Sequence, residues 1–405
     1  MTAAAASRPG LVVFSPLPPG SRSGIAAYTA ELLPALARAR RVTVVVASGR
    51  DVAPAEGAEA VVSEAEYRRS PTLQAQPHLL QLGNSLEHAH VYRAATRGPR
   101  PGVVVLHDPV LHHLVEALTL GRGDAAGYEA AMAANHGAAG RRLARLRRAG
   151  LFSPGQRYLL PLHAEVLDRA RGVIVHSRFA AARLGGGGPP VRVVPHHLSP
   201  AVAAHDGLTR EAARAGLGLP AEDVPVLLSL GHVTPAKGVE VALRALARLR
   251  RDGLDFLYVV AGQSDPAVDL PRLVREAGLE DRVRLTGWLP EAAFFAHARA
   301  ADLLLNLRFP VAGETSGALV RALGMGLPAL VYDFGPAAEY PDPILAKVAY
   351  RPGDPAQAVA QAIGALLANP AGLRARGHAA RAWLRRHCTV ENSAAAILDA
   401  IVAWG

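Results

Sequence analysis

The sequence predicts an α/β protein with two doubly wound parallel sheets, one in each half of the chain. Short, continuous apolar runs recur throughout, among them Val103–Leu106 and Val226–Leu230. Segments with apolar residues at helical spacing lie between most of these runs, and strands that helices cover on both faces have this continuous apolar character. The pattern restarts after about residue 220, which indicates two similar domains rather than a repeat array.

The composition is that of a globular protein. The chain has 405 residues, of which 50% are hydrophobic and 19% charged, enough for two or three domains with full cores. No apolar run approaches the roughly 18 residues of a membrane-spanning helix. The first ten residues, MTAAAASRPG, lack a charged segment followed by an apolar stretch, so we expect a cytoplasmic protein. The single cysteine, Cys388, excludes an intramolecular disulfide and a multi-cysteine zinc site.

The net charge of +10 is compatible with three kinds of acidic partner: nucleotide diphosphates, nucleic acid or an anionic membrane surface. Aromatic residues are only 5% of the chain, and the sequence has no RNP, zinc-finger or helix-turn-helix signature. Nucleic acid is therefore the least favoured partner.

The first half begins with a strand at Leu11–Phe14, a loop with the sequence SPLPPGSRSG, and a helix with Tyr28, Leu32 and Leu36 on one face. This order places Gly24 at a helix N-terminus above the carboxyl end of a strand, where open parallel sheets bind ligands. The absence of GxGxxG argues against a nicotinamide or flavin dehydrogenase. Further strands are predicted over residues 42–47, 60–62, 79–82, 103–106, 173–175 and 191–194.

Polar residues follow the strand at Val103–Leu106 in the segment LHDPVLHH. His107 and Asp108 are therefore expected at the carboxyl edge of the sheet. A metal site formed with His112 and His113 is the alternative. It is disfavoured because the spacing matches no compact zinc pattern and adjacent histidines cannot share a helix face. Three other histidines are predicted to be structural: His176, His196 and His197.

Residues 111–170 are predicted to be helical and include the basic segment RRLARLRRAG. Its five arginines flank only two leucines, Leu143 and Leu146, so the apolar stripe is narrow. A solvated basic helix is the favoured interpretation, and contact with an anionic membrane surface is the alternative.

The second half predicts strands over residues 226–230, 256–261, 283–285, 303–307, 327–332 and 347–349. The segment GHVTPAKG follows the first of them and leads into a helix. Lys237 lies just before that helix, where its charge and the helix N–H groups both favour a pyrophosphate. A solvated loop lysine is the alternative.

The segment after the strand at 303–307 contains a second candidate site. Pro310 and Gly313 break regular structure ahead of an acidic residue, Glu314, and a helix follows that ends at two glycines. A carboxylate, hydroxyls and a glycine thus gather at a helix N-terminus, where N–H groups bind phosphate or sugar oxygens. In the alternative interpretation, Thr315 or Ser316 merely caps the helix.

Six segments resemble, in the same order, retaining glycosyltransferases of the GT-B fold, family 4, and most closely the bacterial members that build polysaccharide or lipopolysaccharide. They are SPLPPGSRSGIAAYTAELLPAL, VVLHDP, VIVHSRFA, SLGHVTPAKG, TGWLP and RFPVAGETSGALVRALGMGLPALV. The resemblance implies an N-terminal Rossmann-like acceptor domain at residues 1–200 and a C-terminal Rossmann-like nucleotide-sugar donor domain at 201–385. A last helix, 386–405, is expected to pack back toward the first domain.

The resemblance also implies roles for individual residues. Glu314 and His107 are the catalytic residues that it implies: Glu314 would hydrogen-bond the donor sugar, and His107 would lie near the sugar and the acceptor, with Asp108 on the acceptor side. Lys237 would hold the donor diphosphate. The other residues implied to contact the donor are Gly24, Trp288, Leu289, Thr315, Ser316 and Gly317. For Trp288, packing in the core is an equal alternative. No obligatory metal and no cofactor are implied.

The sequence departs from the family pattern at two positions. A second glutamate is usual eight residues after the first, where this chain has Ala322. The usual arginine of the phosphate loop is replaced by His232, and Arg308 is a candidate to compensate for the lost charge.

The expected function is the transfer of a hexose, with mannose as one candidate, from a nucleotide diphosphate sugar to a glycan or lipid-linked glycan, in the cytoplasm or at the inner face of the membrane. The alternatives are a catalytically inactive nucleotide-sugar-binding subunit and another GT-B reaction, such as that of an epimerase or a phosphorylase.

Overall fold

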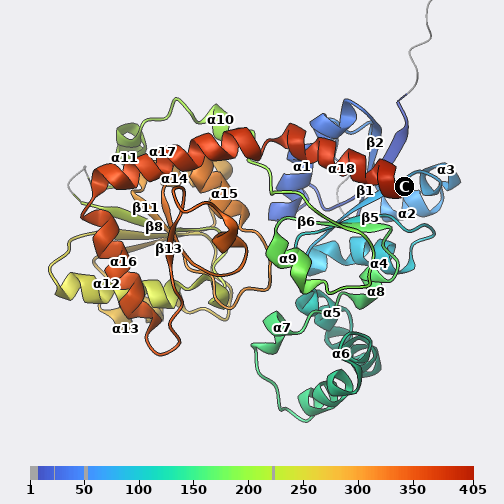
Figure 1. The fold of residues 1–405 in the computed structure, drawn as a ribbon, viewed down its shortest axis with the longest axis horizontal. Helices are drawn as coiled ribbons and strands as arrows, with labels where there is room; N and C mark the ends of the chain where they lie inside the picture. Colours follow the sequence, from blue (N-terminus) through green and yellow to red (C-terminus); the bar gives the residue numbers. More distant parts are fainter. Residues whose placement is uncertain (1–7, 22, 50–52, 221–223) are drawn as a thin grey trace, which may run out of the picture. The chain divides into compact units, whose positions relative to one another are not determined.

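The structure is a computed structural model that describes residues 8–21, 23–49, 53–220 and 224–405 (Figure 1). Its contacts divide the chain into two compact units. The first unit comprises the residues up to His197 together with Ala312–Thr315 and Val390–Gly405, and the second comprises Leu198–Val311 and Ser316–Thr389. Each unit has one parallel sheet with helices, which confirms the predicted fold class. The first seven residues, which contributed to the expected location, lie outside the described residues.

In the first unit, the described strands form a seven-stranded sheet in the order β3-β2-β1-β4-β5-β6-β7, and every neighbouring pair is parallel. All the strands predicted for this half are present. They are β1 (Gly10–Phe14), β2 (Arg41–Val46), β3 (Ala60–Ser63), β4 (His78–Leu82), β5 (Val103–Leu106), β6 (Gly172–Val175) and β7 (Val191–Val193).

The helices of the first unit cover both faces of this sheet. They are α1 (Gly24–Ala37), α2 (Glu64–Arg68), α3 (Pro71–Gln74), α4 (Ala89–Arg97), α5 (His112–Leu118), α6 (Ala125–Arg148), α7 (Gln156–Leu159), α8 (Ala164–Leu167), α9 (Arg178–Arg183) and α18 (Val390–Trp404), with 3₁₀ turns η1 (Leu86–His88) and η2 (Leu120–Arg122). Successive residues of β1 face opposite sides, so Val13 packs with α1 and α18 while Val12 packs with α4, α5 and α6. Both faces are buried, which explains the continuous apolar run.

The predicted helical region between β5 and β6 is confirmed as α5 to α8. Its longest helix, α6, is interrupted at Gly137, where φ is 58° and ψ is −141°. The basic segment from Arg141 onward forms the part of α6 after this break, followed by a short turn.

In the second unit, the described strands form a six-stranded parallel sheet in the order β10-β9-β8-β11-β12-β13. The strands are β8 (Val226–Leu230), β9 (Leu257–Ala261), β10 (Val283–Gly287), β11 (Leu303–Asn306), β12 (Ala329–Tyr332) and β13 (Ala346–Val348). All six were predicted from the apolar runs.

Helices cover both faces of this sheet as well. They are α10 (Ala201–Ala204), α11 (Arg210–Leu217), α12 (Val239–Arg251), α13 (Leu270–Ala277), α14 (Glu291–Ala300), α15 (Gly317–Gly324), α16 (Pro355–Leu367) and α17 (Pro370–His387), with 3₁₀ turns η3 (Pro235–Lys237) and η4 (Gly335–Glu339). Buried residues of α14, α15 and α17 form one core cluster, and those of α12, α13 and α16 form the other.

The strand order places a topological switch point in each sheet. In the second unit, the chain leaves β8 toward β9 on one side and leaves β11 toward β12 on the other, although β8 and β11 are neighbours. In the first unit, β1 and β4 have the same relation. Loops that diverge in this way leave a crevice at the carboxyl ends of the two strands, where ligands bind in open α/β sheets.

Candidate active site

The loop that carries Lys237 follows β8, one of the two strands at the switch point of the second unit. Lys237 Nζ donates to the carbonyl oxygen of Leu230, the last residue of β8, at 2.8 Å. Gly238 then starts α12 with a φ of 69°, and a Cβ at this position would lie 2.1 Å from the carbonyl oxygen of Leu307. Only glycine fits, because the loop packs directly on the backbone that follows β11. The ammonium group is therefore held at the carboxyl ends of β8 and β11.

A second close approach fixes the start of the same loop. Gly262, just after β9, has a φ of 155°, and a Cβ there would lie 2.2 Å from the carbonyl oxygen of Gly231. The backbone N–H of Val233 donates to the carbonyl oxygen of Gln263 at 2.8 Å. The loop that carries the lysine is thus clamped between its two neighbouring strand ends.

Helix α15 begins beside this loop. Ser316 caps it, because its side chain accepts a hydrogen bond from the backbone N–H of Leu319 at 3.3 Å. The hydroxyl of Thr315 is buried and has no partner among the described residues. A small pocket is lined by Gly231 and Lys237 from the first loop and by Ala318 from α15. The structure therefore brings the lysine and the first turn of α15, two elements predicted from the sequence, to one site within the second unit.

The short loop Ala312–Thr315, which contains Glu314, belongs by its contacts to the first unit. Gly313 has a φ of 115°, and a Cβ there would lie 2.5 Å from the side chain of Pro109. Pro109 is two residues after His107 at the end of β5. Glu314 is partly buried, and its contact with a donor sugar stays a prediction.

His107 lies in a chain of hydrogen-bonded groups at the carboxyl edge of the first sheet. Its Nε2 is 2.8 Å from Gln81 Oε1, and its Nδ1 is 3.0 Å from His176 Nε2. His176 Nδ1 in turn lies 2.9 Å from the carbonyl oxygen of Val194. Burial and neighbouring histidines lower the pKa of His107 well below its usual value, and burial lowers the pKa of His176 to about 4. Both rings are therefore neutral at pH 7.

Because both rings are neutral, the direction of each hydrogen bond in this series is fixed. Val194 O only accepts, so His176 carries its proton on Nδ1 and accepts on Nε2. His107 must then donate from Nδ1, which leaves its Nε2 as an acceptor. An acceptor at His107 Nε2 requires a donor opposite it, which the Gln81 side chain provides when its amide is turned so that Gln81 Nε2 faces the ring. In the other orientation Gln81 Nε2 is buried without a partner among the described residues. With both nitrogens engaged, His107 can exchange a proton only by breaking one of these bonds.

Two further histidines extend the cluster around Tyr28, which is fully buried in α1. His197 stacks on the Tyr28 ring at 4.1 Å between centroids, and its Nε2 lies 3.1 Å from Glu31 Oε2. The His196 ring meets the same tyrosine edge-on at 5.0 Å. These contacts agree with the structural role predicted for both residues.

The two other predicted residues of the first unit lie at strand and helix ends. Asp108 accepts a hydrogen bond from the backbone N–H of Asn84 at 2.8 Å. Gly24 is the first residue of α1, which Ser23 caps by accepting from the N–H of Ile25 at 3.2 Å. A Cβ at Gly24 would meet no atom within 4 Å, so packing within the unit does not require a glycine here.

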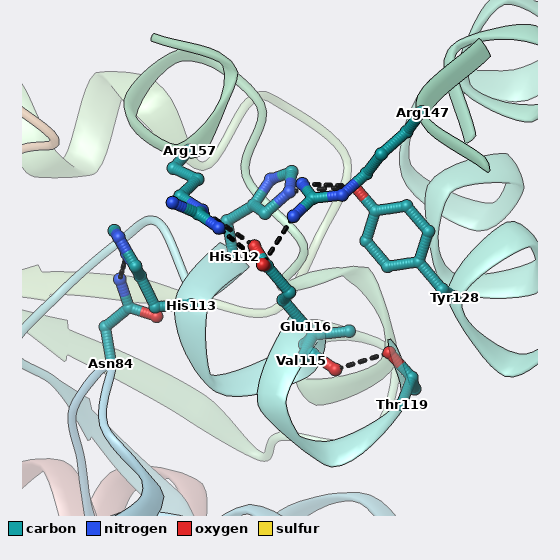
Figure 2. A network of polar contacts seen from close by, with 9 residues as sticks. All are labelled: Asn84, His112, His113, Val115, Glu116, Thr119, Tyr128, Arg147 and Arg157. Atoms are coloured by element: carbon teal, nitrogen blue, oxygen red, sulfur yellow. Dashed lines mark hydrogen bonds and ion pairs between the residues drawn. The ribbon is translucent and has the colours of Figure 1, made fainter. Parts of the chain in front are cut away.

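His112 and His113, which the metal alternative included, belong to a different network (Figure 2). His112 is buried between the carbonyl oxygen of Leu160 at 2.9 Å and the hydroxyl of Tyr128 at 2.9 Å, and burial lowers its pKa to about 4. Beside it, Arg147 and Arg157 both pair with Glu116, as Figure 2 shows. The described residues contain no group of three side chains arranged to hold a metal ion. This network anchors α6 and α7 to α5.

The other residues predicted to contact the sugar donor belong to the second unit. His232 is half-exposed, with Nε2 4.0 Å from Asp265 Oδ2. Trp288 is 50% exposed, so it is not a core residue and the packing alternative is wrong. Leu289 packs at the edge of a core cluster. The N–H of Arg308 donates to the carbonyl oxygen of Asn306 at 3.1 Å.

Ala322, at the position of the missing glutamate, is fully buried on α15 in the core of the second unit. A carboxylate on this backbone position would be taken out of water without a partner, which is costly. The preceding residue, Arg321, is partly exposed. Arg321 was not among the residues predicted from the sequence, although it is the one charged residue in an otherwise apolar helix.

Residues 224–369 match the family model described as Glycosyl transferases group 1. This segment contains Lys237, Glu314 and the whole of α15. A curated relative, the 2-deoxystreptamine glucosyltransferase of Streptomyces kanamyceticus, is 32% identical over 232 residues, which cover 56% of this chain and 59% of the relative. The chain therefore spans about three fifths of the length of that relative.

Solved structures share the fold over nearly the whole chain. The sucrose-phosphate synthase of Thermosynechococcus elongatus superposes with a TM-score of 0.64 at 18% identity and covers 97% of this chain and 98% of its own. HepE of Anabaena, solved in complex with UDP-glucose, superposes with a TM-score of 0.62 at 16% identity, covering 97% of this chain and 99% of its own. At these identities the likeness shows the fold, which is that of the GT-B glycosyltransferases.

Proposed function

We propose that the chain is a glycosyltransferase that moves a hexose from a nucleotide diphosphate sugar to a glycan or lipid-linked glycan acceptor, with retention of the anomeric configuration. The observation that carries the proposal is that Lys237 and the first turn of α15 lie together at the switch point of the second unit. The match of residues 224–369 to glycosyl transferases group 1 supports it. A relative named as a glucosyltransferase and a solved structure in complex with UDP-glucose support a nucleotide sugar as the donor.

The charge that develops during transfer explains why a lysine lies beside the start of a helix here. When the bond from the anomeric carbon to the donor phosphate breaks, the leaving diphosphate gains negative charge. Lys237 and the N–H groups of the first turn of α15 stabilise an anion at that position without reorganising. Glu314 is proposed to hydrogen-bond the hydroxyls of the donor sugar, whose anomeric carbon becomes oxocarbenium-like.

Retention follows if the acceptor oxygen attacks the face that the diphosphate leaves. A bond forms from this oxygen to the anomeric carbon, and the acceptor proton passes to the departing phosphate oxygen. No protein base is needed in this step, which suits the neutral, fully engaged His107 ring. In this mechanism Lys237 supplies the countercharge that a metal ion would otherwise supply, and Arg308 is a candidate second cation.

A second candidate function is a nucleotide-sugar-binding subunit without activity. Ala322 favours it, because this position lies in the core and provides no carboxylate for a ribose contact. His232, in place of the usual arginine, favours it as well. The two candidates differ only in turnover, since both require the donor pocket.

The experiment that separates them incubates the protein with UDP, GDP, ADP and TDP sugars and a panel of glycan acceptors, and measures release of the nucleoside diphosphate. A transferase releases it from one of the donors, and Glu314→Gln lowers the rate by about two to three powers of ten with an unchanged melting temperature. Anomeric analysis of the product by NMR tests retention. Binding of a donor without release from any of them would contradict the transferase and support the inactive subunit.

The location of this activity is also a proposal. No helix within the described residues has both the length and the apolar character needed to span a bilayer. We place the protein in the cytoplasm, with the basic part of α6 as a surface for the inner face of the membrane. Arg142, Arg145 and Arg148 are exposed there together with Leu146 and Leu151. Sedimentation with phosphatidylserine vesicles, and none with phosphatidylcholine vesicles, is the result that this placement predicts.

A further inference from the structure

A second, larger pocket opens at the opposite edge of the sheet in the second unit. Three residues that line it, Pro225, Asp302 and Pro328, directly precede β8, β11 and β12. Because these strands are parallel, all three residues lie at the amino edge of the sheet. Lys237 and the first turn of α15 follow the carboxyl ends of β8 and β11. The pocket is therefore separated from the proposed donor site by the length of the strands, which is roughly 15 Å for five residues.

The pocket has the size and the walls of a small-molecule site. Its volume is about 460 Å³, within the range of roughly 300–1,000 Å³ that is typical of ligand pockets. Apolar side chains from four segments contribute to its lining: Leu208, Leu327, Leu367 and Leu373. The walls are thus suited to an apolar body of the size of one or two rings.

The single acidic residue in the lining, Asp302, is already neutralised. Its carboxylate pairs with Arg210 through one oxygen and with Arg214 through the other, at 2.6 Å in the second case. It also accepts a hydrogen bond from the backbone N–H of Val226 at 2.7 Å. Asp302 therefore serves to hold α11 against β8 and β11, and it adds no net negative charge to the pocket.

Two further arginines in the lining have no acidic partner within the described part of the chain. Arg299, at the end of α14, donates from Nη1 to the carbonyl oxygen of Met325 at 3.0 Å, and its Nε and Nη2 are buried without a hydrogen-bond acceptor. Burial and the nearby Arg381 lower the pKa of Arg299, and Asp206 offsets part of this shift. Arg374, in the first turns of α17, is exposed. His378 follows it by four residues, so both lie on the face of α17 that lines the pocket.

We propose that this pocket binds a small organic anion in which a phosphate or carboxylate is joined to an apolar body. The anionic group is held at Arg374, with Arg299 beneath it, and the apolar body lies against the leucine walls. An anion at this position would be attracted by the charge of Arg374 and Arg299, and a neutral ligand would not. The site is distinct from the donor pocket and does not depend on the proposed reaction.

The test uses phenyl phosphate as the probe, with phenol and inorganic phosphate as its two separate halves. Isothermal titration into the full chain is expected to show binding of phenyl phosphate, weaker binding of inorganic phosphate by at least tenfold, and none of phenol at the same concentration. Equal affinities for phenyl phosphate and inorganic phosphate would overturn the apolar half of the proposal. Binding of phenol as tight as that of phenyl phosphate would overturn the anionic half.

Variants locate the site. Arg374→Ala removes a charge-assisted contact from an exposed position and is expected to weaken phenyl phosphate binding by roughly tenfold or more. Arg386→Ala is the matched control, because it removes the same charge from an exposed site further along α17 and is expected to leave binding unchanged. Equal weakening by Arg374→Ala and Arg386→Ala, or no binding of phenyl phosphate at millimolar concentration, would each contradict the proposal.

Discussion

The carboxyl edges of the two sheets have opposite characters. In the first unit, the edge is occupied by buried histidines that bond to one another, to Gln81 and to backbone carbonyls. In the second unit, the corresponding edge consists of glycines, one lysine and the start of a helix around a pocket. In the first arrangement, both nitrogens of His107 and of His176 have partners within the unit. The second presents a cation and helix N–H groups to whatever binds there.

This difference indicates a division of work between two similar folds. A closed network of neutral rings is rigid and gives up a proton only by breaking a bond, so it is suited to holding a surface in place. A clamped lysine next to a helix N-terminus attracts an anion and needs no rearrangement when charge develops. We therefore propose that the second unit binds the leaving group and that the histidine network of the first has a positioning role.

The distribution of buried histidines adds a contrast in stability. Among the described residues, burial lowers the pKa of seven histidines in the first unit: His78, His88, His90, His107, His112, His163 and His176. Only one described histidine of the second unit, His297, has a pKa lowered in this way. The first unit is therefore the one whose stability depends on neutral imidazoles.

The largest expected effect is the loss of the first unit in acid. Four of its histidines have a pKa of about 4 in the folded state, against about 6.5 in an unfolded chain. The stability from keeping them neutral is complete above pH 6.5 and is lost as the pH falls toward 4, because the unfolded chain binds the extra protons. Each ring accounts for on the order of 3 kcal/mol, so together they approach the roughly 5–15 kcal/mol of a typical domain.

Tryptophan fluorescence can follow each unit in this experiment. Trp404 belongs to the first unit, and Trp288 and Trp383 belong to the second. In a Trp288→Phe, Trp383→Phe background the signal of Trp404 should change between pH 6.5 and 4, whereas a Trp404→Phe variant should retain its signal over this range. Unfolding of the second unit at a higher pH than the first would contradict this contrast in stability.

The next effect in size concerns the lysine of the second unit. Lys237→Ala removes the cation that is proposed to stabilise the leaving group, and turnover should fall by about two to three powers of ten. The chain has only one other lysine, Lys347, which donates to Asp342 and Ala338 away from the pocket. Lys347→Ala is therefore the matched control, and its turnover should stay close to that of the wild type. A similar loss in both variants would show that stability, not the site, is responsible.

A smaller effect is expected from the glycine that clamps the lysine loop. Gly238→Ala would place a Cβ 2.1 Å from the carbonyl oxygen of Leu307, so the backbone has to move. Gly253→Ala is the control, because this glycine also has a positive φ, of 91°, but a Cβ there meets nothing within 4 Å. Gly238→Ala should cost about 1–3 kcal/mol more than Gly253→Ala. Urea unfolding of the second unit in the Trp404→Phe background measures the difference, and equal costs would contradict the close approach.

The elements of both sheets could be predicted from the sequence because parallel strands buried on two faces appear as unbroken apolar runs. Lys237 and the start of α15 could be predicted as well, since each follows such a run within about ten residues and has glycines beside it. In each case the signal is local, within about ten residues.

The histidine network could not be predicted in the same way. His107 and His176 are separated by 69 residues, and only the order of β5 and β6 in the sheet brings them together. The pocket at the amino edge of the second sheet was missed for a similar reason, because Thr209, Arg299 and Arg374 come from three separate helix ends. For Trp288 the sequence was misleading in another way. Its large apolar ring made packing in the core an equal alternative, but the residue lies half-exposed at the end of a strand.

The measurement that tests the central claim most directly is amide hydrogen exchange in the presence of UDP, GDP, ADP or TDP. The claim is that the second unit holds the donor diphosphate at Lys237 and the start of α15. One of the four nucleotides should slow exchange in peptides covering Gly231–Val239 and Ser316–Val320, and Lys237→Ala should abolish that protection. Protection confined to the first unit, or no protection by any of the four at saturating concentration, would contradict the account.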